Sequence, residues 1–124
     1  MAQDFVDIAR ATFEAYVSKD RSAIEALIAA DFHFSSPLDN RLDRATYFAR
    51  CWPNCQHIAS IGLVRFAATH EGVFVTYEGQ ATDGHGFRNT EFLTIRGGQV
   101  AEVDVYFGWS LPHKAAPGGF VDAA

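Results

Sequence analysis

The sequence predicts an α+β domain in which helices occupy the first half and an antiparallel sheet the second. Apolar residues recur at helical spacing in the first half, whereas later segments alternate between apolar and polar residues. Clusters rich in Gly separate the alternating segments, as hairpin turns require. The chain has 124 residues, 48% of them hydrophobic and 11 of them Phe, so a single domain can bury a sizeable core.

The first half contains three helical segments and one short strand. Asp4 and Asp43 are candidate N-caps, and Ser22 starts a Ser-Ala-Ile-Glu stretch with capping-box spacing. Pro37 ends the strand and Pro53 ends the third helix, because proline disfavours the continuation of either element. The expected elements are a helix over 4–18, a helix over 22–28, a strand over 32–36 and a helix over 43–51.

The second half is typical of a meander of four strands joined by short turns. His70-Glu71-Gly72, Asp83-Gly84-His85-Gly86 and Arg96-Gly97-Gly98 supply the turns. We expect one domain over residues 1–110 and a tail over 111–124, whose Pro and Gly content indicates mobility. The expected strands run over 58–69, 73–82, 87–95 and 100–109.

Composition narrows the classes of function and partner. The net charge is -5, which argues against nucleic acid and against an anionic membrane surface as partners. No apolar run is long enough to span a membrane, and the amino terminus lacks a signal-peptide pattern, so we expect a cytoplasmic protein. Cys51 and Cys55 lie near His57, but a structural zinc site needs four ligands and no second cysteine pair exists. We expect free thiols, no metal and no cofactor.

Glu91 is the most informative residue of the chain. It lies in an alternating strand on the same face as Phe87, Leu93 and Ile95, which is the face expected to be apolar. An unpaired carboxylate buried there is costly, so it is either neutralised, paired or used. Glu91 is therefore a candidate acid in a pocket with a raised pKa. The alternative is that a cation such as Arg88 pairs with it at the sheet surface.

The length of each turn decides which residues share the face of Glu91. A turn at residues 83–86 of either two or four residues places Glu78 and Asn89 on that face, whereas Tyr77 faces inward if the register differs. A three-residue turn ending at Gly98 adds Val103, Val105, Phe107 and Trp109, while a two-residue turn replaces Val105 with Asp104. The opposite face then carries Val73, Val75, Tyr77, Phe92 and Tyr106 beside Arg88, Glu102 and Asp104.

Three further residues have the chemistry and the position to reach a ligand. Asp39 follows Ser36-Pro37-Leu38 on a loop near the expected pocket mouth, although Asp39-Asn40 is also an ordinary turn former. Tyr16 and Trp52 are aromatic residues of the expected core or mouth, and their polar atoms can hydrogen-bond a ligand.

These segments resemble those of the SnoaL-like and ketosteroid isomerase superfamily, also called nuclear transport factor 2-like (NTF2-like). The resemblance rests on Tyr16–Leu27, Asp31–Pro37, Ile95–Val100 and Val103–Trp109, and it covers nearly the whole chain. It implies a cystatin-like cone: three N-terminal helices packed on a strongly curved antiparallel sheet with an internal pocket. Because this cone serves isomerases, cyclases, dehydratases, hydrolases and binding modules, the resemblance is specific for fold rather than for reaction.

The resemblance also shows where catalytic positions depart from known branches. In ketosteroid isomerases an aspartate precedes the proline that ends the first strand, and here that position is Ser36. Their second carboxylate falls at Glu91 if the last hairpin is one residue shorter here, and their helix-one tyrosine falls near Thr12 or Phe13, one turn before Tyr16. The Asp-Arg-Asp trio of limonene epoxide hydrolases and the His and Asp of polyketide cyclases are not matched. The chain is most similar to the uncharacterised SnoaL-like branch.

From the residues and the resemblance together we expect a homodimer, formed through the sheet face, whose pocket takes a small apolar molecule with one polar end. If it is an enzyme, Glu91, Glu78 and Asp39 are the candidate acid–base residues, acting without a cofactor on a carbonyl or epoxide oxygen. The alternative is a non-catalytic binding or dimerisation module. The expected ligand contacts are Tyr16, Ser36, Trp52, Asn89, Val105, Phe107 and Trp109.

Overall fold

The computed structural model describes the backbone of residues 2–122 and the side chains of residues 5–122. The helices are α1 (Ala2–Ser18), α2 (Arg21–Leu27) and α3 (Arg44–Arg50), and α3 leads into a 3₁₀ helix, η1 (Trp52–His57). The strands are β1 (Ile28–Ser36), β2 (Asp39–Asp43), β3 (Ile58–Ala68), β4 (Gly72–Ala81), β5 (Gly86–Arg96) and β6 (Gln99–Leu111).

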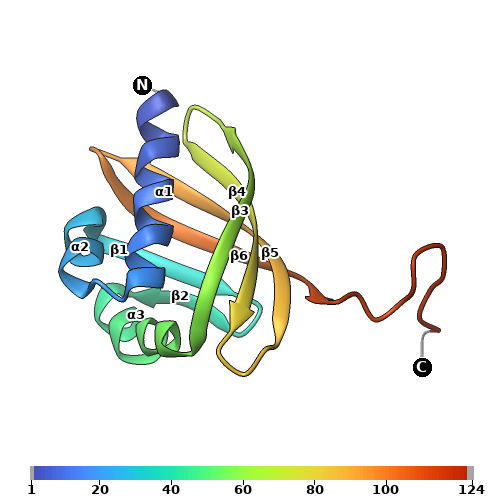
Figure 1. Cartoon of the computed structure of the whole chain (residues 1–124). Helices are drawn as coiled ribbons and strands as arrows, with labels where there is room; N and C mark the ends of the chain where they lie inside the picture. The colour runs from blue at the N-terminus through green and yellow to red at the C-terminus, as the bar shows by residue number, and fades with distance from the viewer. Residues whose placement is uncertain (1, 123–124) are drawn as a thin grey trace.

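The six strands form one strongly curved sheet in the order β2-β1-β6-β5-β4-β3. The helices lie against its concave face, and α1 crosses that face (Figure 1). The expected α+β class is confirmed, with one refinement to the sheet. The sheet is mixed rather than wholly antiparallel, because β1 pairs in parallel with β6, the last strand of the meander. This pairing joins the strand that follows the first two helices to the end of the meander.

Local signals at the helix starts account for two of the three helices. Asp43 caps α3 as expected, since its side chain accepts a hydrogen bond from the Thr46 backbone N–H at 2.8 Å. The expected cap of α2 was wrong: Asp20 fills that position, and Ser22 donates a hydrogen bond to the Asp20 carboxylate at 2.9 Å. Helix α1 begins before Asp4, whose side chain lies outside the described residues.

Strands β1 and β2 form a hairpin that the sequence pattern did not predict. Strand β1 already begins at Ile28, where we expected the second helix to continue. Strand β2 returns from the Pro37-Leu38 turn, with Ser36 paired to Asp39. As a result, Asp39 begins a strand instead of lying on an open loop, and its position is fixed by the sheet.

The core fills the space between the helices and the concave face. Its largest fully buried side chains come from both layers, and one glycine shapes its edge. Gly79 pairs with Phe87 on the neighbouring strand, and a Cβ at Gly79 would overlap the Phe87 ring. The missing side chain therefore lets that ring lie across β4. The largest fully buried side chains are Phe32, Ile24, Leu93, Val73, Val75, Val100 and Cys55.

The segment after β6 leaves the body of the domain. Residues 112–122 form no helix or strand and project away from the sheet (Figure 1). Strand β6 ends at Leu111, so the last strand runs one residue beyond the expected domain limit at 110. Among the described residues, no helix is long and apolar enough to cross a membrane.

Candidate functional site

A cavity of about 290 Å³ lies between the concave face of the sheet and the helices. This volume is at the small end of the range for ligand pockets. Side chains of β4, β5 and β6 form one wall, α1, α2 and α3 the other, and the β1–β2 hairpin reaches one end. The mouth is marked by Leu38 and Phe107, which line the cavity and are 82% and 53% exposed.

Glu91 is the most deeply held carboxylate in this cavity. Strand pairing places it directly between Val75 and Val105, both of which are buried. The Tyr77 hydroxyl donates a hydrogen bond to Glu91 Oε2 at 2.5 Å. Asn89 Nδ2 lies 3.5 Å from the same hydroxyl and donates to it. The three side chains form a polar group on an otherwise apolar wall, hereafter the Glu91 cluster.

The pKa of Glu91 is raised from 4.5 to about 7. The largest cause is burial, which removes water from the charged form, and the hydrogen bond from Tyr77 acts in the opposite direction by stabilising the carboxylate. Glu91 is half-buried in terms of exposed area, because one side of its carboxyl group faces the cavity. The protein around it is nevertheless dense enough to desolvate the charge. A carboxyl group with this pKa populates both protonation states near neutral pH.

The strand register places Tyr77 inside and Glu78 outside, so the prediction for Glu78 was wrong. Tyr77 pairs with Asn89 and Glu78 pairs with Arg88, which shifts every residue of β4 to the opposite face from the one we expected. The cause is the connection between β4 and β5, whose last pair is Gln80 with Gly86. The five residues between them give the opposite parity to a turn of two or four.

On the outer face Glu78 forms an ion pair with Arg88 at 2.5 Å and takes no part in the cavity. The same shift of register moves three β4 side chains from the expected outer face to the inner face. They are Val73, Val75 and Tyr77, and all three are buried.

The β5–β6 hairpin contains two irregularities whose effects cancel over part of its length. Its turn has only two residues, Gly97 and Gly98, both with positive φ, where we expected three. An irregularity at Ala101 then adds one residue to β6 and restores the expected phase. Val105 and Phe107 therefore line the cavity as predicted, and Asp104 faces outward.

A second bulge moves Trp109 out of the cavity, where we had expected it to contact the ligand. Arg88 pairs with Trp109 but Asn89 pairs with Phe107, so Gly108 is the extra residue. A side chain at Gly108 would overlap the Arg88 carbonyl oxygen. The Gly108 N–H donates to Asn89 Oδ1 at 3.1 Å, which also orients the Asn89 amide toward Tyr77.

The helices add two tyrosine hydroxyls to the cavity. Tyr16 from α1 and Tyr47 from α3 both line it, and burial raises the pKa of each well above 10. The charge of Glu91 contributes to the raised pKa of both. Neither hydroxyl has a hydrogen-bond partner among the described residues, so each is available to a ligand.

Trp52 does not reach the cavity, contrary to the prediction. It is 7% exposed and packs against Tyr16, with ring centroids 5.7 Å apart, and against Phe48 at 6.3 Å. Because the Pro53 break turns the chain into η1, the indole is placed behind the cavity wall. Trp52 therefore supports Tyr16 without contacting a bound molecule.

Ser36 and Asp39 form a second polar group, at the mouth. Ser36 Oγ donates to Asp39 Oδ2 at 2.8 Å and accepts a hydrogen bond from the Leu38 N–H at 3.0 Å. Both side chains line the cavity as predicted. The cavity thus holds two carboxylates, one deep and one near solvent.

The cysteines have different positions. Cys51 lines the cavity, and burial raises the pKa of its thiol to about 11, so it is a thiol rather than a thiolate at neutral pH. Cys55 is fully buried in the core. Both are free. No group of three or more His, Cys, Asp or Glu side chains suited to a metal ion occurs among the described residues.

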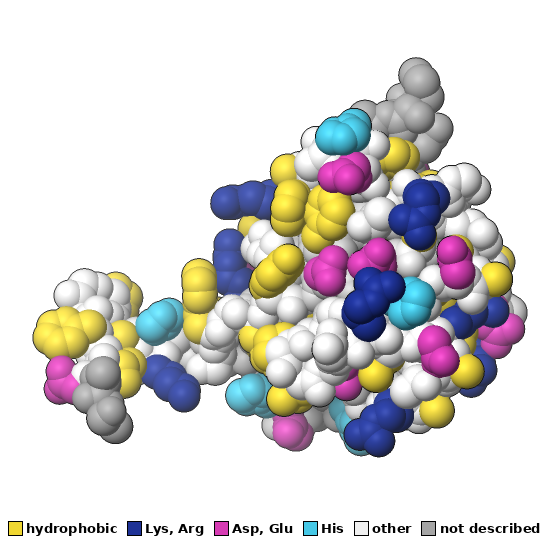
Figure 2. Space-filling model, turned by 180° about the vertical axis from the view of Figure 1, so that it is seen from behind, with side chains coloured by type: hydrophobic (Ala, Val, Ile, Leu, Met, Phe, Trp, Pro, Cys, Tyr) yellow, Lys and Arg dark blue, Asp and Glu magenta, His cyan; other side chains and the backbone are white. Residues whose placement is uncertain are grey.

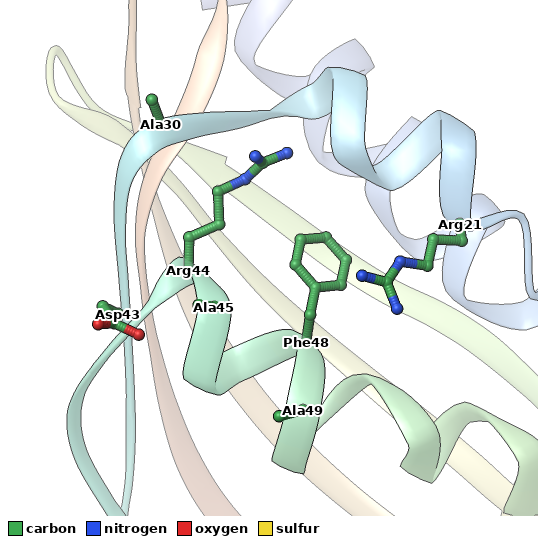
Figure 3. Close-up of a pocket in the computed structure, with 7 residues that line it drawn as sticks. All are labelled: Arg21, Ala30, Asp43, Arg44, Ala45, Phe48 and Ala49. Atoms are coloured by element: carbon green, nitrogen blue, oxygen red, sulfur yellow. The ribbon is translucent and has the colours of Figure 1, made fainter.

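A wider depression of about 600 Å³ lies between α2, β1 and α3 (Figure 3). It is open to solvent, and its charged residues have protein partners, although Arg44 Nε is buried without one in the part of the chain that the structure describes. Arg21 pairs with Glu25 at 2.7 Å, Arg44 donates to the Glu25 backbone carbonyl at 2.7 Å, and Asp43 caps α3. Both guanidinium groups lie against the Phe48 ring, at 4.3 and 5.4 Å from its centroid. We place the candidate site in the cone, where carboxyl and phenol groups face a largely enclosed space.

Sequence reasoning assigned no role to Tyr47, Phe34 and Cys51 in the site, and it placed Tyr77 inside only as an alternative. Tyr77 alternates with two valines of β4, a pattern that marks the buried face once the phase of that strand is known. Tyr47 and Cys51 are four residues apart on one helical face, the spacing expected for a shared wall.

No family model matches the chain, and no curated protein matches it in sequence. Solved structures are similar to it in fold. A structure described as a candidate ketosteroid isomerase from Kribbella flavida DSM 17836 is 18% identical with a TM-score of 0.74, over 99% of this chain and 91% of that one. An LEH-like epoxide hydrolase from M. tuberculosis is 14% identical with a TM-score of 0.74, over 86% and 84%.

An NTF2-like protein of unknown function from Burkholderia pseudomallei is 18% identical with a TM-score of 0.69, over 85% of this chain and 91% of that one. At these identities the likeness concerns the fold. The chain has the cone fold of NTF2-like proteins, as its sequence predicted.

Proposed function

We propose that this chain binds a small, largely apolar molecule in the cone and that Glu91 exchanges a proton with it, or donates a hydrogen bond to it, at a carbonyl or epoxide oxygen. The observation that carries this proposal is the Glu91 cluster: a carboxyl group with a pKa of about 7, held by Tyr77 on an apolar wall. A group poised near neutral pH is what proton transfer requires.

The geometry gives the two oxygens of Glu91 different tasks. Oε2 accepts the hydrogen bond from Tyr77, so a proton on Glu91 resides best on Oε1. That proton can then be donated to a ligand oxygen. The hydroxyls of Tyr16 and Tyr47 belong to side chains that line the same cavity, and in this proposal they donate to the same ligand oxygen. Negative charge developing on that oxygen would be stabilised in a site with little water.

Asp39 is the candidate for the complementary task of base or water-positioning group. It lines the same cavity from the β1–β2 hairpin, and Ser36 fixes its orientation at 2.8 Å. Isomerisation, dehydration, cyclisation and hydrolysis all need one group that gives a proton and one that takes it. The similar structures described as an isomerase and an epoxide hydrolase are compatible with this range of reactions.

Proton exchange with a simple ketone tests the proposal without knowledge of the natural ligand. 2-Tetralone is a small apolar ketone whose α-protons exchange with deuterium when a base and an acid act on it. Proton NMR in D₂O measures this exchange with wild type, Glu91→Gln and Tyr77→Phe. We expect exchange above the buffer rate in wild type and its loss in Glu91→Gln, with Tyr77→Phe intermediate.

The same ketone also distinguishes an enzyme from a binding module. Isothermal titration of 2-tetralone gives its affinity for wild type and Glu91→Gln. Retained binding with lost exchange supports the acid–base role. Binding that depends on Glu91 without any exchange in wild type favours the alternative, a non-catalytic binding module. Absence of both contradicts the proposal.

We also propose that a second copy of the chain covers the outer face of the sheet. Phe74, Tyr106 and Trp109 lie there and are 42%, 57% and 53% exposed. Hydrophobic side chains are interspersed with acidic and basic ones on this side of the molecule (Figure 2). A twofold contact brings a patch against its own copy, and a patch carrying both signs of charge can complement itself. Sedimentation equilibrium of wild type and Tyr106→Glu tests this: we expect a dimer and a monomer, and a wild-type monomer contradicts it.

A further inference from the structure

The cavity has two polar groups that stand on different strands of the sheet. The Glu91 cluster stands on β4 and β5, where Tyr77 is 5% exposed. Asp39 lies at the mouth, directly after Leu38, which is 82% exposed. Strands β1 and β6 lie between β2, which carries Asp39, and β5, which carries Glu91, so a ligand that lies across these strands can meet both carboxyl groups.

Asp39 is a preorganised acceptor. The Ser36 hydroxyl occupies Oδ2, and the Leu38 N–H holds that hydroxyl in place. The two-residue turn at Pro37-Leu38 fixes the backbone on which both side chains stand. Oδ1 has no hydrogen-bond partner among the described residues. An acceptor held in place with one free oxygen loses little entropy when it binds a donor.

The charge of Asp39 is not balanced by the protein. Among the described side chains that line the cavity, none is Lys, Arg or His. Arg41, two residues along β2, pairs with Glu102 at 3.3 Å, and no ion pair of Asp39 occurs within the described residues. Its negative charge acts into the cavity, since Cys51 also lines it and the charge of Asp39 contributes to the raised pKa of that thiol, while the charge of Arg50 acts in the opposite direction. A cavity with this lining repels anions and attracts cations.

We infer that the ligand of this cavity carries a protonated amine that binds Asp39 at the mouth, in addition to the oxygen that faces Glu91. This inference rests on the proposed function, because it describes a second end of the same ligand. An ammonium group at the mouth forms a charge-assisted hydrogen bond with Oδ1 while keeping part of its hydration. A hydroxyl there forms the weaker neutral counterpart, and a carboxylate is repelled.

Three naphthols with one variable group test the inference. 6-(Aminomethyl)-2-naphthol, 6-(hydroxymethyl)-2-naphthol and 6-hydroxy-2-naphthoic acid share a ring and a phenol, and they differ in the charge at the other end. Their dissociation constants are measured by fluorescence titration at pH 7 with wild type, Asp39→Asn and Glu91→Gln. We expect the amine to bind wild type about tenfold more tightly than the alcohol, and the acid to bind most weakly.

The variants show which carboxylate recognises the amine. Asp39→Asn should reduce the preference for the amine over the alcohol to about twofold or less. Glu91→Gln should weaken the binding of all three probes and preserve that preference. Ser36→Ala keeps the charge of Asp39 but removes the hydroxyl that orients its carboxylate. This variant should still prefer the amine, by a smaller factor than wild type. Thermal unfolding of each variant verifies that it is folded.

Two results overturn the inference alone: equal binding of amine and alcohol by wild type, or a preference that survives Asp39→Asn. In either case the proposed function still stands if the naphthols bind wild type and bind Glu91→Gln more weakly. If wild type binds none of the naphthols but still exchanges the α-protons of 2-tetralone, this inference fails and the proposed function stands; if wild type does neither, both fail.

Discussion

Glu78 and Glu91 lie on neighbouring strands of one sheet, yet their surroundings give them opposite properties. Glu78 faces outward and pairs with Arg88 at 2.5 Å. Glu91 faces the cavity between two buried valines, has a phenol as its partner and has a pKa of about 7. The difference comes from which face of the sheet each one occupies. A cation beside a carboxylate stabilises its charge, whereas an apolar wall destabilises it.

The largest expected effect concerns the core beneath the inner face. Leu93 is fully buried on the face of Glu91, while Thr94 is its neighbour on the outer face. Leu93→Ala should lower the free energy of unfolding by about 3 kcal/mol, through lost burial and a new cavity. Thr94→Ala is the matched control and should change it by less than about 1 kcal/mol. Urea denaturation measures both, and equal losses would contradict the assignment of faces.

Removing the charge of each glutamate should change the free energy of unfolding in opposite directions. Glu91 binds a proton more strongly in the folded state, where its pKa is about 7, than in the unfolded chain, where its pKa has the ordinary value of 4.5. Its contribution to stability therefore falls as the pH rises from 4.5 to 7 and remains unfavourable above 7. At pH 8, Glu91→Gln should raise the free energy of unfolding by about 2 to 3 kcal/mol, and at pH 4 it should have little effect.

Glu78→Gln removes one partner of a half-buried ion pair on the outer face. It should lower stability at pH 8 by at most about 1 kcal/mol. Thermal and urea unfolding of both variants at pH 4 and pH 8 tests the contrast. A Glu91→Gln variant that is less stable than wild type at pH 8 would show that Glu91 is held as a favourable charge.

The bulge at Gly108 moves Trp109 to the outer face of β6, and a substitution at Gly108 tests it. A methyl group there would overlap the Arg88 carbonyl oxygen, so Gly108→Ala should cost about 1 to 3 kcal/mol. Gly62, on β3, is exposed, and a methyl group on it would meet only the Glu78 carbonyl oxygen, at 4.0 Å. Gly62→Ala should therefore be neutral or slightly stabilising. Similar losses in both variants, measured by urea denaturation, would argue against the bulge.

The smallest expected effect separates the two causes of the Glu91 pKa. Burial raises the pKa and the Tyr77 hydroxyl lowers it. Tyr77→Phe removes only the second cause, so the pKa of Glu91 should rise further, by about one unit. Carbon-13 NMR titration of the carboxyl group measures it, with Glu91→Gln identifying the resonance. A fall in the pKa would mean that water replaces the lost hydroxyl.

The residues that sequence reasoning placed correctly are those whose position follows from alternation within one strand. Glu91 and Asn89 are on the expected face because β5 is regular between them. Residues that depended on a turn were less secure: Glu78 was misplaced by one residue of loop length, and Trp109 by one bulged glycine. Alternation says which residues share a face, but it does not say how two strands are phased.

The helical side of the site was harder to predict for a different reason. Trp52 was expected in the core or at the mouth and is buried, and Tyr47, which was given no role, is buried as well. Helical spacing does not say which buried aromatic side chains border a cavity, since that depends on where the packing is incomplete. The parallel pairing of β1 with β6 was also missed, because it joins segments about 70 residues apart. The cytoplasmic location stays a prediction.

The extra residue at Ala101 makes this hairpin unusually sensitive to changes in length. Adding or removing one residue there would leave the Gly97-Gly98 turn and the backbone ladder able to form. Everything between Glu102 and Phe107 would then exchange sides. The hydrocarbon wall of the cavity would be replaced by Glu102 and Asp104, and the outer face would receive the valines. Among descendants of this sequence, we therefore expect substitutions along β6 to be tolerated far more often than insertions or deletions.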